Sequence, residues 1–137
     1  MKQTFDTDSI LFGILKKSPV KNAISGNIYV GDDRPDDSQD EDIVVNSIDL
    51  TQDYLPQIGT SNVNIYVPDM ITSIGGKQQM KSNRVRLKAL SEKAMNALRS
   101  ASVPGLLFSI ESQNVLAEPN TKQHFVNIRI SWNIQTD

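Results

Sequence analysis

The stretch KSNRVRLKALSEKAMNALRSASVPGLLFSIESQNVLAEPNTKQHFVNIRISW (Lys81–Trp132) decides the fold, because it joins one amphipathic segment to two alternating ones. Apolar residues of the first segment recur at steps of three and four, which places them on one face of a helix: Leu87, Leu90, Ala94, Leu98 and Ala101. We expect this helix to run from about Asn83 to Ala101, with Ser82 or Asn83 as its N-cap. Pro104 and Gly105 would follow its end.

Two runs with a period of two residues come next, over 106–118 and 124–135, with Pro119, Asn120 and Thr121 between them. They predict a C-terminal β-hairpin. Its last strand would span ~37 Å from His124 to Ile134 at about 3.4 Å per residue, which is long for a strand. We therefore expect that it could extend beyond the domain or lie against a neighbouring chain.

The remaining elements are shorter. We expect a helix over 5–17, one further helical turn over 20–24, and strands over 27–30, 43–50 and 62–67, with Val44, Asn46, Ile48 and Leu50 on one face of the second strand. Residues 52–61 read as a connection, and residues 70–81 as a flexible loop, because they lack a period and contain Gly75-Gly76. The predicted fold is α+β: a mostly antiparallel sheet of about five strands, two main helices with the long one packed on the sheet, and the C-terminal hairpin.

Length and composition place limits on the class of protein. A chain of 137 residues favours a single domain over 1–137. The sequence contains no cysteine, which excludes disulfides and thiolate chemistry and fits an intracellular or assembly protein. No apolar run approaches the roughly 20 residues of a membrane span, and the short apolar patch near the N-terminus does not resemble a signal peptide. A soluble protein without membrane contact is expected.

Charge is unevenly distributed along the chain. Residues 32–42, called here the acidic loop, hold seven acidic residues against the single base Arg34. A solvated, mobile loop is the plain interpretation; contact with a basic neighbouring chain is the main alternative. A calcium site is disfavoured, because the order of ligands found in an EF-hand is missing.

The long helix has the opposite bias, with six bases against one acid over 81–101. Bases in its first turn oppose the helix dipole, which mildly favours a partner on the outer face. The basic residues are consistent both with a solvated charged face and with a contact between subunits. Nucleic acid is a further candidate, although the helix has no aromatic residue to stack on a base.

Residues able to support catalysis are few. His124 is the only histidine, it lies at the start of a strand, and a structural role is expected for it. No zinc spacing, nucleotide-binding glycine motif or nucleophile elbow is present. We expect that the protein is not an enzyme and that it uses no cofactor, metal or small-molecule substrate. The alternative is a small hydrolase that uses His124.

The order of these elements resembles the tail terminator (tail completion) proteins of long-tailed bacteriophages and prophages. Three segments carry the likeness: the alternating strand Asn64-Ile65-Tyr66-Val67, the helical run Arg86–Leu98, and the hairpin Phe108–Ile134 with its polar tip. The resemblance implies a structural α+β protomer without catalysis. It also implies a homohexameric ring that caps the tail tube and meets the head connector protein, made in the cytoplasm of the bacterial host and carried in the virion tail.

Such a ring needs head-to-tail contacts between subunits, and the two charged segments could supply one. The hypothesis pairs Asp36, Asp37 and Asp40 of one subunit with three bases of the next, which are Arg84, Arg86 and Lys88. Two other functions remain open. One is another phage role, as a head–tail connector or tail tube subunit; the other is a nucleic-acid-binding module that uses helix 81–101, although nucleic acid is not the expected partner.

Overall fold

A computed structural model describes residues 1–136 of the chain, in ten elements. The helices are α1 (Thr4–Lys16), α2 (Val20–Ala23) and α3 (Arg84–Ser100). The strands are β1 (Ile28–Val30), β2 (Ile43–Leu50), β3 (Gln57–Pro68), β4 (Met70–Ile74), β5 (Lys77–Lys81), β6 (Leu106–Glu118) and β7 (Gln123–Ile134).

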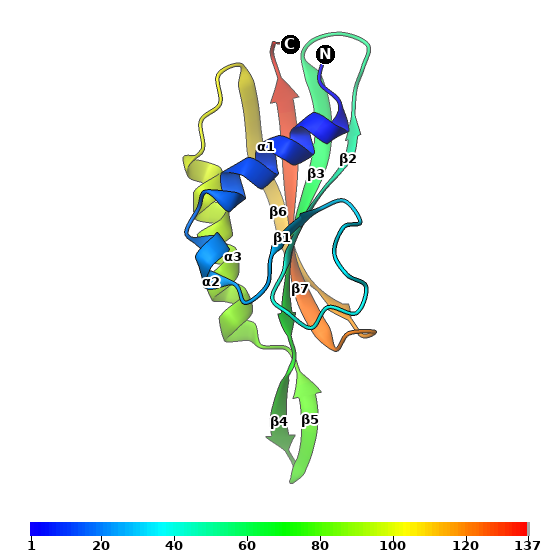
Figure 1. Ribbon diagram of the computed structural model, residues 1–137, viewed down its shortest axis with the longest axis vertical. Helices are drawn as coiled ribbons and strands as arrows, with labels where there is room; N and C mark the ends of the chain where they lie inside the picture. The colour runs from blue at the N-terminus through cyan, green and yellow to red at the C-terminus, as the bar shows by residue number, and fades with distance from the viewer. Residues whose placement is uncertain (137) are drawn as a thin grey trace.

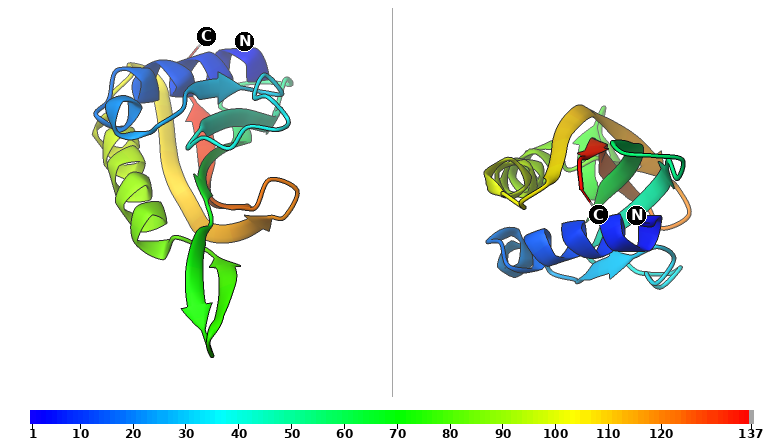
Figure 2. Two further views of the ribbon diagram at one scale, coloured as in Figure 1. Left: turned by 60° about the horizontal axis from the view of Figure 1, so that its bottom comes forward. Right: turned by 90° about the horizontal axis from the view of Figure 1, so that it is seen from above.

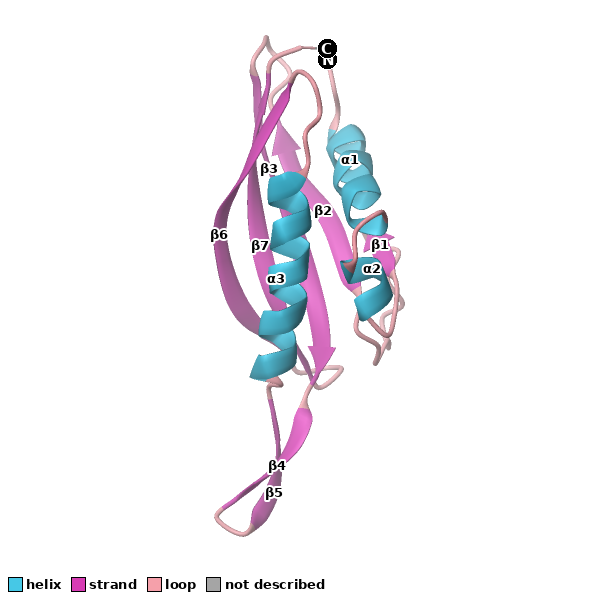
Figure 3. Ribbon diagram, turned by 90° about the vertical axis from the view of Figure 1, so that its left-hand side faces the viewer, coloured by secondary structure: helices cyan, strands magenta, loops and turns pink. Residues whose placement is uncertain are grey.

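Five strands form the main sheet in the order β1-β2-β3-β7-β6, with only the β1–β2 pair parallel. The three helices all lie on one face of this sheet, with α3 alongside β6 and β7 and with α1 and α2 nearer β1 and β2 (Figures 1 and 3). The predicted α+β fold is confirmed, including the mostly antiparallel five-stranded sheet, the long helix packed on it and the C-terminal hairpin.

The core lies between the helices and the inner face of the sheet. The predicted stripe of α3 faces inward, with Leu87, Leu90, Ala94 and Leu98 all buried. Asn83 is the N-cap, as predicted, since its side-chain oxygen accepts a hydrogen bond from the Arg86 backbone N–H at 3.2 Å. These buried apolar faces hold the sheet and helices together.

A chain of buried hydroxyl groups fixes α1 on the sheet. The Oγ atoms of Thr7 and Ser47 lie 2.6 Å apart, and Ser47 Oγ lies 2.7 Å from Ser61 Oγ. The Trp132 indole N–H donates to Ser61 Oγ at 2.8 Å. Since Thr7, Ser61 and Trp132 are all almost fully buried, these hydrogen bonds satisfy polar groups that would otherwise be costly to bury.

Residues 70–81 are not a structureless loop, so that prediction was wrong. They form a second, two-stranded sheet from β4 and β5, joined by Gly75 and Gly76, both at positive φ. We call this hairpin the arm; it projects away from the body along the long axis (Figures 1 and 2). Because glycine tolerates positive φ, the two glycines form the tight turn between β4 and β5. In the sequence alone, the same pair indicates a flexible loop.

Two further expectations are corrected. The connection predicted over 52–61 is shorter, because β3 already begins at Gln57. The last strand does not extend beyond the domain, since β7 is paired along its length with β3 on one side and β6 on the other. Its length is matched by that of its two neighbours, with 12 residues in β3 and 13 in β6.

Candidate assembly interface

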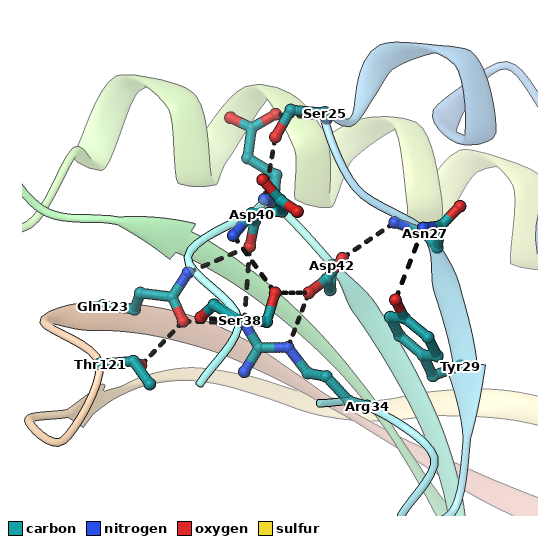
Figure 4. Close-up of polar contacts among 10 residues, drawn as sticks. Ser25, Asn27, Tyr29, Arg34, Ser38, Asp40, Asp42, Thr121 and Gln123 are labelled. Carbon is teal, nitrogen blue, oxygen red and sulfur yellow. Dashed lines mark hydrogen bonds and ion pairs between the residues drawn. The ribbon is translucent and has the colours of Figure 1, made fainter. Parts of the chain in front are cut away.

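The acidic loop is held in a defined position by its single base. The Arg34 guanidinium lies 2.9 Å from the Asp42 carboxylate and donates to Gln123 Oε1 at 2.8 Å (Figure 4). Its central carbon also lies 3.9 Å from the centre of the Tyr66 ring, which is a cation–π contact. Arg34 therefore ties the loop to β3 and β7, and gives it a defined position although most of its acids are exposed.

Asp42 is the buried partner in this network, with a side chain only 1% exposed. Besides Arg34, its carboxylate accepts hydrogen bonds from the Asn27 backbone N–H at 2.9 Å and from the Ser38 hydroxyl at 2.5 Å (Figure 4). These three donors, one of them cationic, compensate the buried carboxylate for its desolvation. Through Asn27, it also fixes the start of β1 beside β2.

A second ion pair joins the end of the acidic loop to α3. Glu41 accepts two hydrogen bonds from Arg86, from Nε at 2.6 Å and from Nη2 at 2.8 Å. The hydrogen bond from Arg86 lowers the pKa of the Glu41 carboxyl, against an opposing effect of burial. Arg86 Nη2 also donates to the Ala23 carbonyl, so Nε and Nη2 of this partly exposed guanidinium both have partners within their own chain.

The six residues predicted to lie at a subunit interface differ in availability. Five are exposed: Asp36, Asp37, Asp40, Arg84 and Lys88. Lys88 pairs with Glu92 one turn along α3, at 3.4 Å. The sixth, Arg86, is used by Glu41 of the same chain. The end of the acidic loop reaches α3 through Glu41, while most of the loop, cyan in Figure 1, lies across the body from that helix.

His124 is paired with an aspartate. Its Nδ1 lies 2.6 Å from the Asp69 carboxylate, at the junction between β3 and the arm, and the two side chains are 28% and 10% exposed. Among residues 1–136, no group of three or more His, Cys, Asp or Glu side chains is placed to hold a metal ion.

The outer side of β6 is an open sheet edge. Within the described part of the chain, β6 pairs with β7 and, apart from an isolated bridge between Leu106 and Val103, has no strand along its other side. Three large apolar side chains on β6 are exposed: Leu107, Val115 and Leu116. A long edge with apolar side chains is a template for pairing with another chain.

A groove of about 580 Å³ lies between α3 and β6. Val85, which is 83% exposed, lines it together with Met95 and Val115, while Arg84 and Lys88 add positive charge. Val85 is not part of the buried stripe of α3. The groove and the open edge of β6 are adjacent, since Val115 belongs to both.

Sequence reasoning missed the partners inside the chain. Arg34 was read only as a lone base among acids, although one cation amid seven acids is a signal for an internal ion pair. Glu41 was counted with the loop, but its contact with Arg86 joins residues 45 positions apart, which no local pattern reveals. The open edge of β6 was also not foreseen, because strand order cannot be read from alternation.

Comparison with known proteins adds no identity. No protein-family model matches the chain, and a search of curated proteins finds no match either. Among the described residues, no helix has both the length and the apolar character needed to cross a membrane.

Proposed function

We propose that this protein is a structural subunit that assembles with copies of itself and performs no catalysis. The open edge of β6 carries this proposal, since a 13-residue strand with three exposed apolar side chains would be an aggregation hazard in a protein that works alone. Pairing with another chain satisfies its backbone groups and covers the apolar side chains.

The proposed role is that of a tail terminator: a homohexameric ring that caps a phage tail tube and meets the head connector. Support comes from the resemblance in the order of elements, in the run Arg86–Leu98 and in the hairpin Phe108–Ile134. The exposed apolar residues of the body and of the arm lie at separate places, which suits a subunit with several protein partners.

Charge contacts would set the register of such a ring. Three exposed acids of one subunit, Asp36, Asp37 and Asp40, would approach Arg84 and Lys88 of the next. Arg86 is engaged by Glu41 in its own chain. Exposed pairs of this kind contribute roughly 0–1 kcal/mol each. They would therefore govern orientation and salt sensitivity more than affinity.

The test is native mass by light scattering across protein concentration, at low and high salt. The double variant Val115→Lys/Leu116→Lys puts two charges on the open edge, and we expect it to weaken assembly at least tenfold. The matched control Ile48→Lys changes an apolar side chain that is 54% exposed on β2, and it should assemble like the wild type. A wild-type protein that stays monomeric at every concentration contradicts self-assembly.

The phage role needs a separate test, which is cosedimentation with purified tail tubes. A terminator should bind tube ends in a limited, saturable amount, whereas a tail tube subunit would extend the tubes. Nucleic acid is the second candidate partner, because Arg84, Lys93 and Arg99 of α3 are all exposed. Tight, salt-dependent binding to DNA or RNA, lost on replacing these three bases by Gln, would favour that function instead.

A further inference from the structure

The two edges of the main sheet differ in whether they can accept a strand. β1 covers residues 43–45 of β2, and beyond it the Ser47 backbone N–H donates to the Asp8 carboxylate at 2.7 Å. We call this the closed edge. Only β6 offers a long open edge among the strands of this sheet that the structure describes (Figure 3). In an assembly of copies of this chain, the two main candidates for a strand added to β6 are β6 of a second copy and the arm.

The arm is poorly stabilised by its own residues. Its four large apolar side chains, Met70, Ile71, Ile74 and Met80, are between 42% and 63% exposed. Ile71 and Met80 are opposite each other and share one face, while Met70 and Ile74 lie on the other. A two-stranded hairpin that is exposed on both faces is marginally stable in water. The arm thus has free strand edges and apolar surface that a partner would cover.

Charge favours contact between the arm and β6. The arm contains Lys77 and Lys81 and no acidic residue, whereas β6 contains Glu111 and Glu118 and no base. A strand of the arm placed beside β6 would therefore bring opposite charges together along with the apolar residues.

Pairing of β6 with itself offers no such charge complementarity. In the antiparallel register centred between Asn114 and Val115, Glu111 lies directly opposite Glu118, twice by symmetry, and no register pairs either acid with a base, because β6 contains none. Such a pair would also close at a dimer, with no open edge left for further subunits.

We propose that the arm of one copy adds as a strand to the open edge of β6 in the next copy. This inference rests on the proposed self-assembly and names the contact that carries it. Strand addition would supply backbone hydrogen bonds, and the side chains of both partners would give specificity. Because the arm and β6 are different surfaces, the contact is head-to-tail and can close into a ring.

The experiment uses two variants of the full chain. One lacks the arm, and the other has a blocked β6 edge. The arm-shortened variant replaces Ile71–Met80 by Asn-Gly, a two-residue turn that can join the paired residues Met70 and Lys81. The edge-blocked variant is Val115→Lys/Leu116→Lys. Native mass spectrometry of each variant alone, and of an equimolar mixture, reads out the assembly, with circular dichroism to show that both are folded.

Each variant alone should be monomeric, and the mixture should give a one-to-one dimer and nothing larger, because only one intact arm and one intact edge remain per pair. As a second readout, Lys77→Glu/Lys81→Glu should weaken assembly about tenfold, and Glu111→Lys/Glu118→Lys in the same chain should restore it.

Other outcomes overturn the inference in distinguishable ways. If the arm-shortened chain assembles like the wild type while the edge-blocked chain does not, β6 has a different partner and self-assembly stands. If the arm-shortened chain forms only dimers with itself, β6 pairs with β6. If the wild-type chain never assembles, both this contact and the proposed function fail.

Discussion

At the closed edge of the sheet, β1 is three residues long and Asp8 occupies the first free N–H of β2 beyond it. At the open edge, β6 is 13 residues long, and none of the described strands lies along its outer side. Both edges belong to one sheet with one core, so the stability of the fold does not by itself explain why one edge is covered and the other is not. The difference shows that side chains from α1 and the acidic loop close one edge, while the other remains able to pair.

Two aspartates hold the closed edge in place. Asp42 accepts the Asn27 N–H at the start of β1, and Asp8 accepts the Ser47 N–H on β2. Both side chains are buried, at 1% and 8% exposed. The closed edge should therefore be sensitive to single substitutions that the open edge tolerates.

The largest effect is expected at Arg34. Arg34→Met leaves the buried Asp42 carboxylate without its cation, and breaking a buried ion pair from one side costs about 3–5 kcal/mol. Urea denaturation followed by circular dichroism measures the loss. Arg129→Met, the same change at an exposed arginine of β7, should stay within about 0.5 kcal/mol of wild type.

Adding Asp42→Asn to the Arg34→Met variant removes the uncompensated charge and should recover part of the stability. If Arg34→Met unfolds at the same urea concentration as the wild type, the Arg34–Asp42 pair does not hold the closed edge.

A smaller effect is expected at Asp8. Asp8→Ala removes the acceptor of the Ser47 N–H and should cost about 1–3 kcal/mol, because a buried donor is left unsatisfied. It also frees part of β2 to accept a strand, so dynamic light scattering should show more association than in the wild type. Asp8→Asn keeps an acceptor oxygen and should lose less. Equal losses in both variants would mean that charge, not the hydrogen bond, matters at this position.

The elements that the sequence predicts best are long and periodic. The helix over 83–101 and the strands over 106–118 and 124–135 agree with α3, β6 and β7 to within about one residue at each end. In these segments the apolar pattern matches a single buried face, and cap or turn residues mark the ends. Local information is sufficient there.

Elements whose form depends on distant partners could not be predicted. β3 begins at Gln57, within the segment that the sequence predicts as a connection. Its Gly59 is typical of a turn, but here it allows close packing: a Cβ at this position would lie 2.4 Å from the Asp49 carbonyl oxygen of β2. A shift of register between Ser47 and Asp49 breaks the alternation of β2, so Leu50 is buried and does not share a face with Asn46 as predicted.

The candidate interface shows the same limit. Exposure of Asp36, Asp37, Arg84 and Lys88 agrees with the residue types, but the engagement of Arg86 depends on Glu41, which the fold brings to it. That these exposed residues meet across subunits stays a prediction.

The smallest effect, and one that depends on pH, is expected at Glu41, which ties the acidic loop beside the closed edge to α3. Its folded-state pKa is lowered from 4.5, chiefly by the hydrogen bond from Arg86. The stabilising contribution is therefore fully present above that unfolded value and is lost as pH falls through the lower folded pKa. Glu41→Gln should cost about 1 kcal/mol at pH 7, because Arg86 is partly exposed and solvent screens the pair.

Urea denaturation at a series of pH values from 7 to about 3 checks this expectation, since the stabilities of wild type and Glu41→Gln should converge below pH 4.5. Asp36→Asn, an exposed acid of the same loop, is the matched control and should run parallel to the wild type. If the difference in the free energy of unfolding between Glu41→Gln and wild type is as large in acid as at pH 7, then packing, and not charge, stabilises this contact. Convergence would instead show that the closed edge is held partly by titratable groups, so that acid should loosen β1 while β6 keeps its pairing with β7.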